Sequence, residues 1–127
     1  MNLNTIKTTR TADDEKFATM SAEASAINAA WNAGRIVGFP TTRAYAVIEV
    51  NAVGSLFPCV AVYNSFAVRG ALKIRGYKFD GATKAWYLRC DSVADAKSEA
   101  EAIAANGIQL GGAITREDHE AMRAKTK

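Results

Sequence analysis

The stretch NSFAVRGALKIRGYKFDGATKAWYLRC, residues 64–90, decides the fold predicted for this chain. Its first part runs to Gly76, a residue type that ends helices because it adopts positive φ without strain, and predicts a helix over residues 66–75. Its second part holds two aromatic-rich runs on either side of residues 81–84, which predicts a β-hairpin over residues 77–90. A helix followed at once by a hairpin is the unit around which the rest of the chain is arranged.

The side chains of this unit are expected to divide between a packed and an open face. In the helix, four apolar side chains are assigned to the core: Phe66, Ala67, Ala71 and Ile74. In the hairpin, a bend at residues 81–84 would set Phe79 opposite Trp86 on the packed face. The open face would then present Lys78, Tyr87 and Arg89, and a slip of one residue would exchange the two faces. For Tyr87 and Arg89, a binding role and a merely solvent-exposed role both stay open.

Two strands are predicted before this unit. Residues 43–50, RAYAVIEV, and residues 56–63, LFPCVAVY, are rich in β-branched and aromatic residues. Residues 51–55, NAVGS, form a turn segment between them. The sequence therefore predicts an antiparallel hairpin whose second strand, almost wholly apolar, lies inside the sheet.

A long amphipathic helix is predicted over residues 11–33 and ends at Gly34. Its apolar residues follow one another at steps of three and four: Phe17, Met20, Ala24, Ile27 and Trp31. Such a stripe is typical of a helix face that packs on a core, and a surface for a partner is the alternative.

After the hairpin the sequence predicts a helix over residues 93–105, a short strand over 108–110 and a polar helix over 115–127. Runs of strands broken by helices indicate an α+β domain. We expect residues 1–127 to form a single domain, with one antiparallel sheet of about five strands and helices mainly on one face.

Composition narrows the classes of function. The chain has 127 residues, 49% of them apolar, and a net charge of +3, so it is neither disordered nor strongly basic. Across residues 43–90, seven basic residues stand against two acidic ones, Glu49 and Asp80. This asymmetry suits an anionic partner, or it keeps one face soluble. No membrane span or signal peptide is predicted, and two cysteines without a disulfide framework suggest the cytoplasm.

The sequence carries no catalytic signature. His119 is the only histidine, so a metal motif that needs two histidines is excluded. A catalytic triad would have to use this one histidine, in a polar segment near the end of the sequence, as its base, and nothing supports that role. The glycines match no phosphate-binding loop. We therefore expect no catalytic residue, no metal and no cofactor.

A basic and aromatic unit is the remaining candidate site. Lysine and arginine beside tyrosine can hold a phosphate and stack a base. The candidate ligand-binding residues are Phe66, Arg69, Lys73, Arg75, Lys78, Tyr87 and Arg89. Tyr63 is a further candidate for the wall of such a pocket.

The run ALKIRGYKFDGATKAWYL, residues 71–88, resembles a helix–hairpin pattern of small phage, prophage and plasmid proteins. It is also similar to the hairpin of helicase-associated HARP modules. The resemblance carries over no catalytic residue. It implies a mobile-element origin and a counter-defence role in the cytoplasm of a host cell.

Three classes of function follow. The first is capture of a phosphate-bearing ligand without chemistry, either a nucleotide immune signal, as in anti-Thoeris sponges, or single-stranded nucleic acid. The second is inhibition of a host defence protein by direct binding, as anti-CRISPR proteins do. The third is an unrecognised nuclease or nucleotidase. A nucleotide pocket is more easily built between two subunits than within so small a domain, so we expect a homodimer or higher homo-oligomer.

Overall fold

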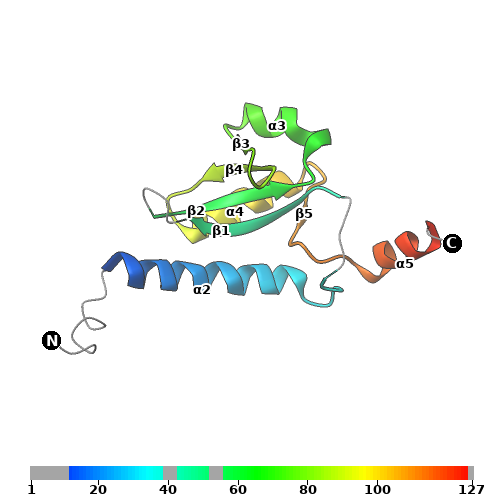
Figure 1. The fold of residues 1–127 in the computed structure, drawn as a ribbon, viewed down its shortest axis with the longest axis horizontal. Coiled ribbons are helices and arrows are strands. Elements are labelled where there is room, and N and C mark those ends of the chain that lie inside the picture. Colours follow the sequence, from blue (N-terminus) through cyan, green and yellow to red (C-terminus); the bar gives the residue numbers. More distant parts are fainter. Residues whose placement is uncertain (1–11, 39–42, 52–55, 126–127) are drawn as a thin grey trace.

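The computed structural model describes residues 12–38, 43–51 and 56–125, and the fold is α+β (Figure 1). Its helices are α2 (Ala12–Asn32), α3 (Arg69–Ile74), α4 (Val93–Ala104) and α5 (Arg116–Lys125), with a 3-10 turn, η1 (Phe66–Val68), before α3. Its strands are β1 (Tyr45–Asn51), β2 (Phe57–Tyr63), β3 (Lys78–Asp80), β4 (Ala85–Arg89) and β5 (Gln109–Leu110). Most of the predicted turn at 51–55, and the predicted helix ends at residues 11 and 127, lie outside the described residues.

The five strands form one mixed sheet in the order β3-β4-β2-β1-β5. Pairing is antiparallel between β1 and β2, β2 and β4, and β4 and β3, but β5 runs parallel to β1. The prediction of a purely antiparallel sheet was therefore wrong at one edge. The reason is the connection: α4 packs across β1 and β2, and carries the chain back so that β5 starts from the end at which β4 started.

The core lies between one face of the sheet and the helices α2 and α4. Alternate residues of the two central strands, among them Ile48, Val60 and Val62, are at most 2% exposed. On α4, Ala96 and Ala100 are fully buried, and their small side chains let the helix lie close to the strands. Helices mainly on one face is the arrangement that the sequence predicted.

The long helix α2 packs beside β1, along the lower side of the sheet in Figure 1. Ala24 is buried, and Met20, Ile27 and Trp31 are partly buried against the core, as the apolar stripe predicted. The Asn28 amide donates to the Ile48 carbonyl at 2.9 Å and accepts from the Ile48 N–H at 3.0 Å. These two bonds satisfy the backbone hydrogen-bonding groups of Ile48, which lies beyond the part of β1 that pairs with β5. No helix within the described residues combines the length and apolarity needed to cross a membrane.

The face of α3 that packs on the core differs from the prediction. Phe66 and Ile74 are 76% and 89% exposed, while Leu72 is 1% exposed and Val68 is packed against the core. Ala67 and Ala71 are exposed as well, so all four predicted core positions were wrong. The 3-10 turn explains the change, because a segment that starts with three residues per turn presents different side chains from an α-helix begun at Phe66.

Candidate ligand-binding groove

A groove of about 540 Å³ opens between η1, α3 and the β3–β4 hairpin, at the edge of the sheet opposite β5. Seven residues line it: Asn64, Ser65, Phe66, Arg69, Phe79, Lys84 and Trp86. We call it the basic-aromatic groove, because three aromatic rings and two cationic side chains surround it. No carboxylate is among these described lining residues, so nothing in the lining neutralises the two cations.

One wall is formed by Phe66 and Arg69. These two residues are three apart along η1 and the start of α3, and therefore lie on the same side. The Arg69 guanidinium carbon lies 3.7 Å from the centroid of the Phe66 ring, and the same guanidinium donates a hydrogen bond to the Phe66 carbonyl. The cation is thus held in place at the rim, over an exposed ring.

The facing wall is the cross-strand pair Phe79 and Trp86. Their ring centroids lie 5.5 Å apart with the planes tilted by 56°, as the predicted hairpin register required. Trp86 is partly buried against the core, but Phe79 is 52% exposed, so its assignment to the core was wrong. β3 is the edge strand of the sheet, so within the described part of the chain no further strand lies beside Phe79 on its outer side.

Backbone strain also gathers at this groove. Among the described residues, only two that are not glycine have positive φ, Asn64 at 54° and Lys84 at 59°, and both line it. Lys84 ends the hairpin loop, where its N–H donates to the Asp80 carbonyl at 2.8 Å. The loop is fixed from the other end by the Asp80 carboxylate, which accepts hydrogen bonds from the Ala82 N–H and the Thr83 hydroxyl. A lysine in this conformation costs about 1 kcal/mol, and such strain is commonly found at binding sites.

The predicted site residues do not all meet at this groove. Phe66 and Arg69 line it, whereas Lys73 is exposed on α3 and is absent from the lining of the described grooves. Arg75 has another role, because it holds the Glu99 carboxylate in a bidentate pair at 2.7 and 2.9 Å.

Glu99 is the centre of a small polar cluster on the helical side. The Tyr77 hydroxyl donates to the same carboxylate at 2.9 Å. Hydrogen bonds from Arg75, with a smaller contribution from Tyr77, lower the pKa of Glu99 below its ordinary value. Burial, followed by the hydrogen bond to Glu99, raises the pKa of Tyr77. Arg75 therefore ties α3 to α4 and is occupied within the fold.

The remaining three predicted residues lie on the open face of the sheet, the face away from α2 and α4. Lys78 pairs with Tyr87 across β3 and β4, and Arg89 pairs with Cys59 across β4 and β2. The Arg89 guanidinium carbon lies 4.5 Å from the centroid of the Phe57 ring. The seven predicted residues therefore do not form one site. Two line the basic-aromatic groove, two lie outside it at α3, and three lie on the open face of the sheet.

Lys84 was not among the predicted site residues, and Phe79 and Trp86 were predicted to belong to the core. The signal for Lys84 was present in the loop length, because the last residue of a four-residue hairpin loop commonly adopts positive φ. No comparable signal marked Phe79, since its exposure depends on where the sheet ends.

Burial disfavours the ionised form of both cysteine thiols. Burial raises the pKa of the Cys59 thiol to about 12, so this thiol is protonated at neutral pH. Burial also raises the pKa of Cys90. The part of the chain that the structure describes contains no group of three or more histidine, cysteine, aspartate and glutamate side chains able to hold a metal ion.

Comparison of the chain with models of known protein families, with curated proteins and with solved structures finds no match.

Proposed function

We propose that the protein binds a phosphate-bearing ligand with a flat aromatic base in the basic-aromatic groove, and holds it without converting it. The observation that carries this proposal is the convergence of three aromatic rings and two cations, Arg69 and Lys84, on one groove, with no carboxylate among its described lining residues. Its volume of about 540 Å³ suits a nucleotide, because small-molecule sites typically span roughly 300–1,000 Å³.

The lining suggests how the ligand would be held. A base would stack on the exposed Phe66 ring or on the Phe79–Trp86 pair, an interaction that contributes about 1–3 kcal/mol per base. The phosphate would lie between Lys84 and Arg69, which approach from opposite walls. Lys84 supplies a mobile point charge and Arg69 a planar one, and planar guanidinium groups match phosphate oxygens well.

The number of cations favours a small nucleotide over a nucleic-acid strand. Proteins that follow a nucleic-acid backbone neutralise about 6–10 phosphates, and their affinity falls steeply with salt. Among the residues that the structure describes, two cations line this groove, Arg69 and Lys84. A protein that binds a nucleotide signal in this way, in the cytoplasm of a host cell, would lower its free concentration and so counter a defence system.

Calorimetric titration of the purified chain with adenosine monophosphate, ADP-ribose, a cyclic dinucleotide and a single-stranded oligothymidylate tests this proposal. We expect one nucleotide to bind with weak salt dependence, and Lys84→Gln to weaken it roughly tenfold because a charge-assisted contact is lost. Lys73→Gln, on the same surface but outside the groove, is the matched control and should bind like the wild type. Unchanged affinity of Lys84→Gln would contradict the groove, and appearance of a product during long incubation would contradict capture without conversion.

A second function, inhibition of a defence protein by direct binding, is favoured by one observation. Ile74 at the end of α3 and Phe66 in η1 are exposed to solvent, at 89% and 76%. Exposed apolar side chains of this size are common at protein interfaces. A partner that uses this surface would be lost with Ile74→Asp and kept with Lys84→Gln, which is the reverse of the pattern expected for nucleotide binding.

Self-association through α2 remains part of the proposal. Phe17, near the start of the apolar stripe, is 38% exposed, so the stripe is incompletely covered by the sheet. We expect a homodimer by light scattering, and Phe17→Glu to convert it to a monomer. A wild-type chain that stays monomeric at high concentration would exclude this interface.

A further inference from the structure

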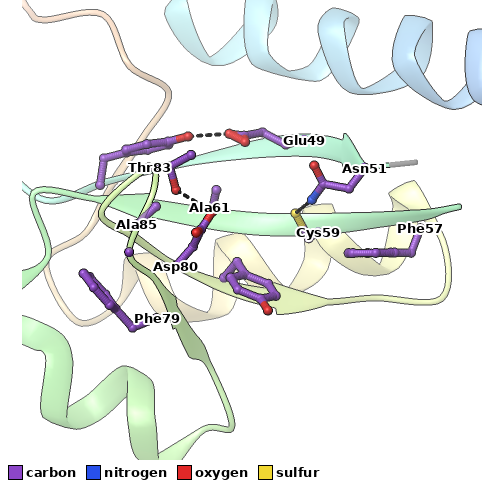
Figure 2. Close-up of a pocket in the computed structure, with 12 residues that line it drawn as sticks. Glu49, Asn51, Phe57, Cys59, Ala61, Phe79, Asp80, Thr83 and Ala85 are labelled. Carbon is purple, nitrogen blue, oxygen red and sulfur yellow. Dashed lines mark hydrogen bonds between the residues drawn. The ribbon is translucent and has the colours of Figure 1, made fainter. Parts of the chain in front are cut away.

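The open face of the sheet contains a second cavity, of about 380 Å³, shown in Figure 2. Strand register explains it. Cys59, Ala61 and Ala85 lie on this face of β2 and β4, and their small side chains form the floor of the cavity. Larger side chains surround this floor, namely Phe57, Tyr63 and Tyr87. We call it the open-face cavity.

The charged groups that line the open-face cavity are carboxylates. Its lining includes the carboxylates of Glu49 and Asp80 but no lysine or arginine among the described lining residues. Glu49 accepts a hydrogen bond from the Tyr63 hydroxyl through one oxygen. Within the described part of the chain, its other oxygen has no hydrogen-bond partner.

The neighbouring amide extends this pattern. The Asn51 side-chain nitrogen donates to the Cys59 sulfur at 3.3 Å, which leaves the Asn51 carbonyl oxygen as a further acceptor. Figure 2 shows Glu49 and Asn51 along β1, Cys59 on β2, and Asp80 on the hairpin side. A ligand that enters this cavity therefore meets acceptors and ring faces, the reverse of the chemistry in the basic-aromatic groove.

We propose that the open-face cavity is a second binding site, for an organic cation: a guanidinium or alkylammonium group on a short apolar stem. The faces of aromatic rings attract cations through their quadrupole, and a carboxylate beside the rings adds charge attraction in a partly desolvated place. A metal ion fits less well, because no group of three or more metal-ligating side chains occurs within the described residues.

The chain itself shows that this face accepts such a group. The Arg89 guanidinium carbon lies 4.5 Å from the centroid of the Phe57 ring, on the side of the cavity next to Cys59. Arg89 does not line the open-face cavity, but its charge beside the Phe57 ring opposes the approach of a second cation to that ring. Removing the charge of Arg89 is therefore expected to strengthen binding of a ligand cation.

The test compares butylguanidinium with butylurea, which has a similar shape without the charge, by NMR titration of the full chain. We expect butylguanidinium to shift the resonances of Glu49 and Tyr87, and butylurea to cause no saturable shift. Glu49→Gln keeps an oxygen that accepts from Tyr63 and should weaken binding at least fivefold, while Arg89→Gln should strengthen it two- to fivefold, in keeping with a single cation–ring or charge contact.

Two outcomes would overturn the proposal: equal binding of butylurea, or unchanged affinity of Glu49→Gln. If Glu49→Gln does not fold, Tyr87→Leu replaces it, because this variant removes a ring that has no hydrogen bond to lose within the described residues. Nucleotide affinity should be unchanged in Glu49→Gln, so the two sites are tested independently.

A third arm identifies the source of the cation. A capped tripeptide with a central arginine presents the same guanidinium on a peptide backbone. Tighter binding of the tripeptide than of butylguanidinium would point to a basic side chain of a partner protein, and equal or weaker binding would point to a free amine or guanidine. Either result supports an organic-cation site, and failure of both probes to bind rejects it.

Discussion

At the scale of single residues, Lys84 combines a strained backbone with a side chain in the basic-aromatic groove. Its φ of 59° is one that glycine adopts without cost. Lys84→Gly should therefore raise the free energy of unfolding by up to about 1 kcal/mol, measured by urea denaturation, because the relief of strain outweighs the added flexibility of the unfolded chain. The same change should weaken nucleotide binding roughly tenfold, since it removes the cation.

Lys84→Ala is the matched control for this prediction. It removes the same charge but keeps a Cβ in the strained conformation, so it should lose binding without gaining stability. If Lys84→Gly were no more stable than Lys84→Ala, the strain would be absent. If Lys84→Gly bound nucleotide normally, the Lys84 cation would not contribute to binding.

Glu99 gives the fold a dependence on pH. Its pKa is lower in the fold than the ordinary value of 4.5, chiefly because Arg75 holds the ionised form by hydrogen bonds. The stabilisation is therefore complete well above pH 4.5 and is lost as the pH falls through the lower, folded pKa. Urea denaturation should show Glu99→Gln to be less stable than the wild type at pH 7, with a difference that shrinks below pH 4.5.

Tyr77→Phe tests the contribution of the Tyr77 hydroxyl to the same cluster and leaves the Glu99 carboxylate in place. The loss of one hydrogen bond to Glu99 should lower the free energy of unfolding by about 1 kcal/mol at pH 7.

The pH dependence of Glu99→Gln has its own contradicting outcome. If the difference in stability between wild type and Glu99→Gln stayed constant down to pH 3, the Arg75 pair would not stabilise the ionised carboxylate.

At the scale of elements, the sequence was sufficient where the pattern is local. Gly76, at which the helix before the hairpin was predicted to end, has positive φ and follows α3. At α4, the Ser92 hydroxyl accepts from the Asp95 N–H. The phase of α3 was not local. The 3-10 turn lets Leu72 face the core while Phe66 and Ile74 point to solvent. The sequence pattern alone also allowed the reverse, with Phe66 and Ile74 buried, and only packing against the rest of the fold decides between the two.

The bend between β5 and α5 provides a test of element packing. A Cβ on Gly111 would lie 2.3 Å from the side-chain oxygen of Asn32, the last residue of α2. That oxygen accepts a hydrogen bond from the Ala113 N–H. Gly111→Ala should therefore lower the free energy of unfolding by about 2–4 kcal/mol, through the clash and through its φ of +86°.

Gly107→Ala is the matched control, because its φ is +87° but, apart from its chain neighbours, no described residue has an atom within 4 Å of the added Cβ. It should cost only the backbone term, about 1 kcal/mol. Equal losses in thermal or urea unfolding of the two variants would show that the contact of α2 with this bend does not contribute to stability.

At the scale of the whole molecule, the sequence predicted the register of the hairpin but not what covers each of its faces. Lys78, Tyr87 and Arg89 do share a face, as predicted. They lie apart from Phe66 and Arg69 because the sheet stands between them, and the helices that cover its other face come from distant parts of the chain. The same long-range placement leaves both a groove beside α3 and a cavity on the open face.

Phe79 lines both the basic-aromatic groove and the open-face cavity, and it is 52% exposed. A ligand in either site would restrict this ring, so the second ligand would meet a wall that is already ordered. The two proposed ligands also carry opposite charges. We therefore expect adenosine monophosphate and butylguanidinium to strengthen each other's binding by the same factor, two- to fivefold, since coupling between two sites is reciprocal.

Calorimetric titration of each ligand with and without saturating amounts of the other measures this factor. Phe79→Ala should weaken both ligands and abolish the coupling. Phe57→Ala changes a ring that lines only the open-face cavity of the two, so it should weaken the cation alone. Additive binding in the wild type would show that the two sites act independently even though they share Phe79, and coupling that survives Phe79→Ala would place its origin in the charges.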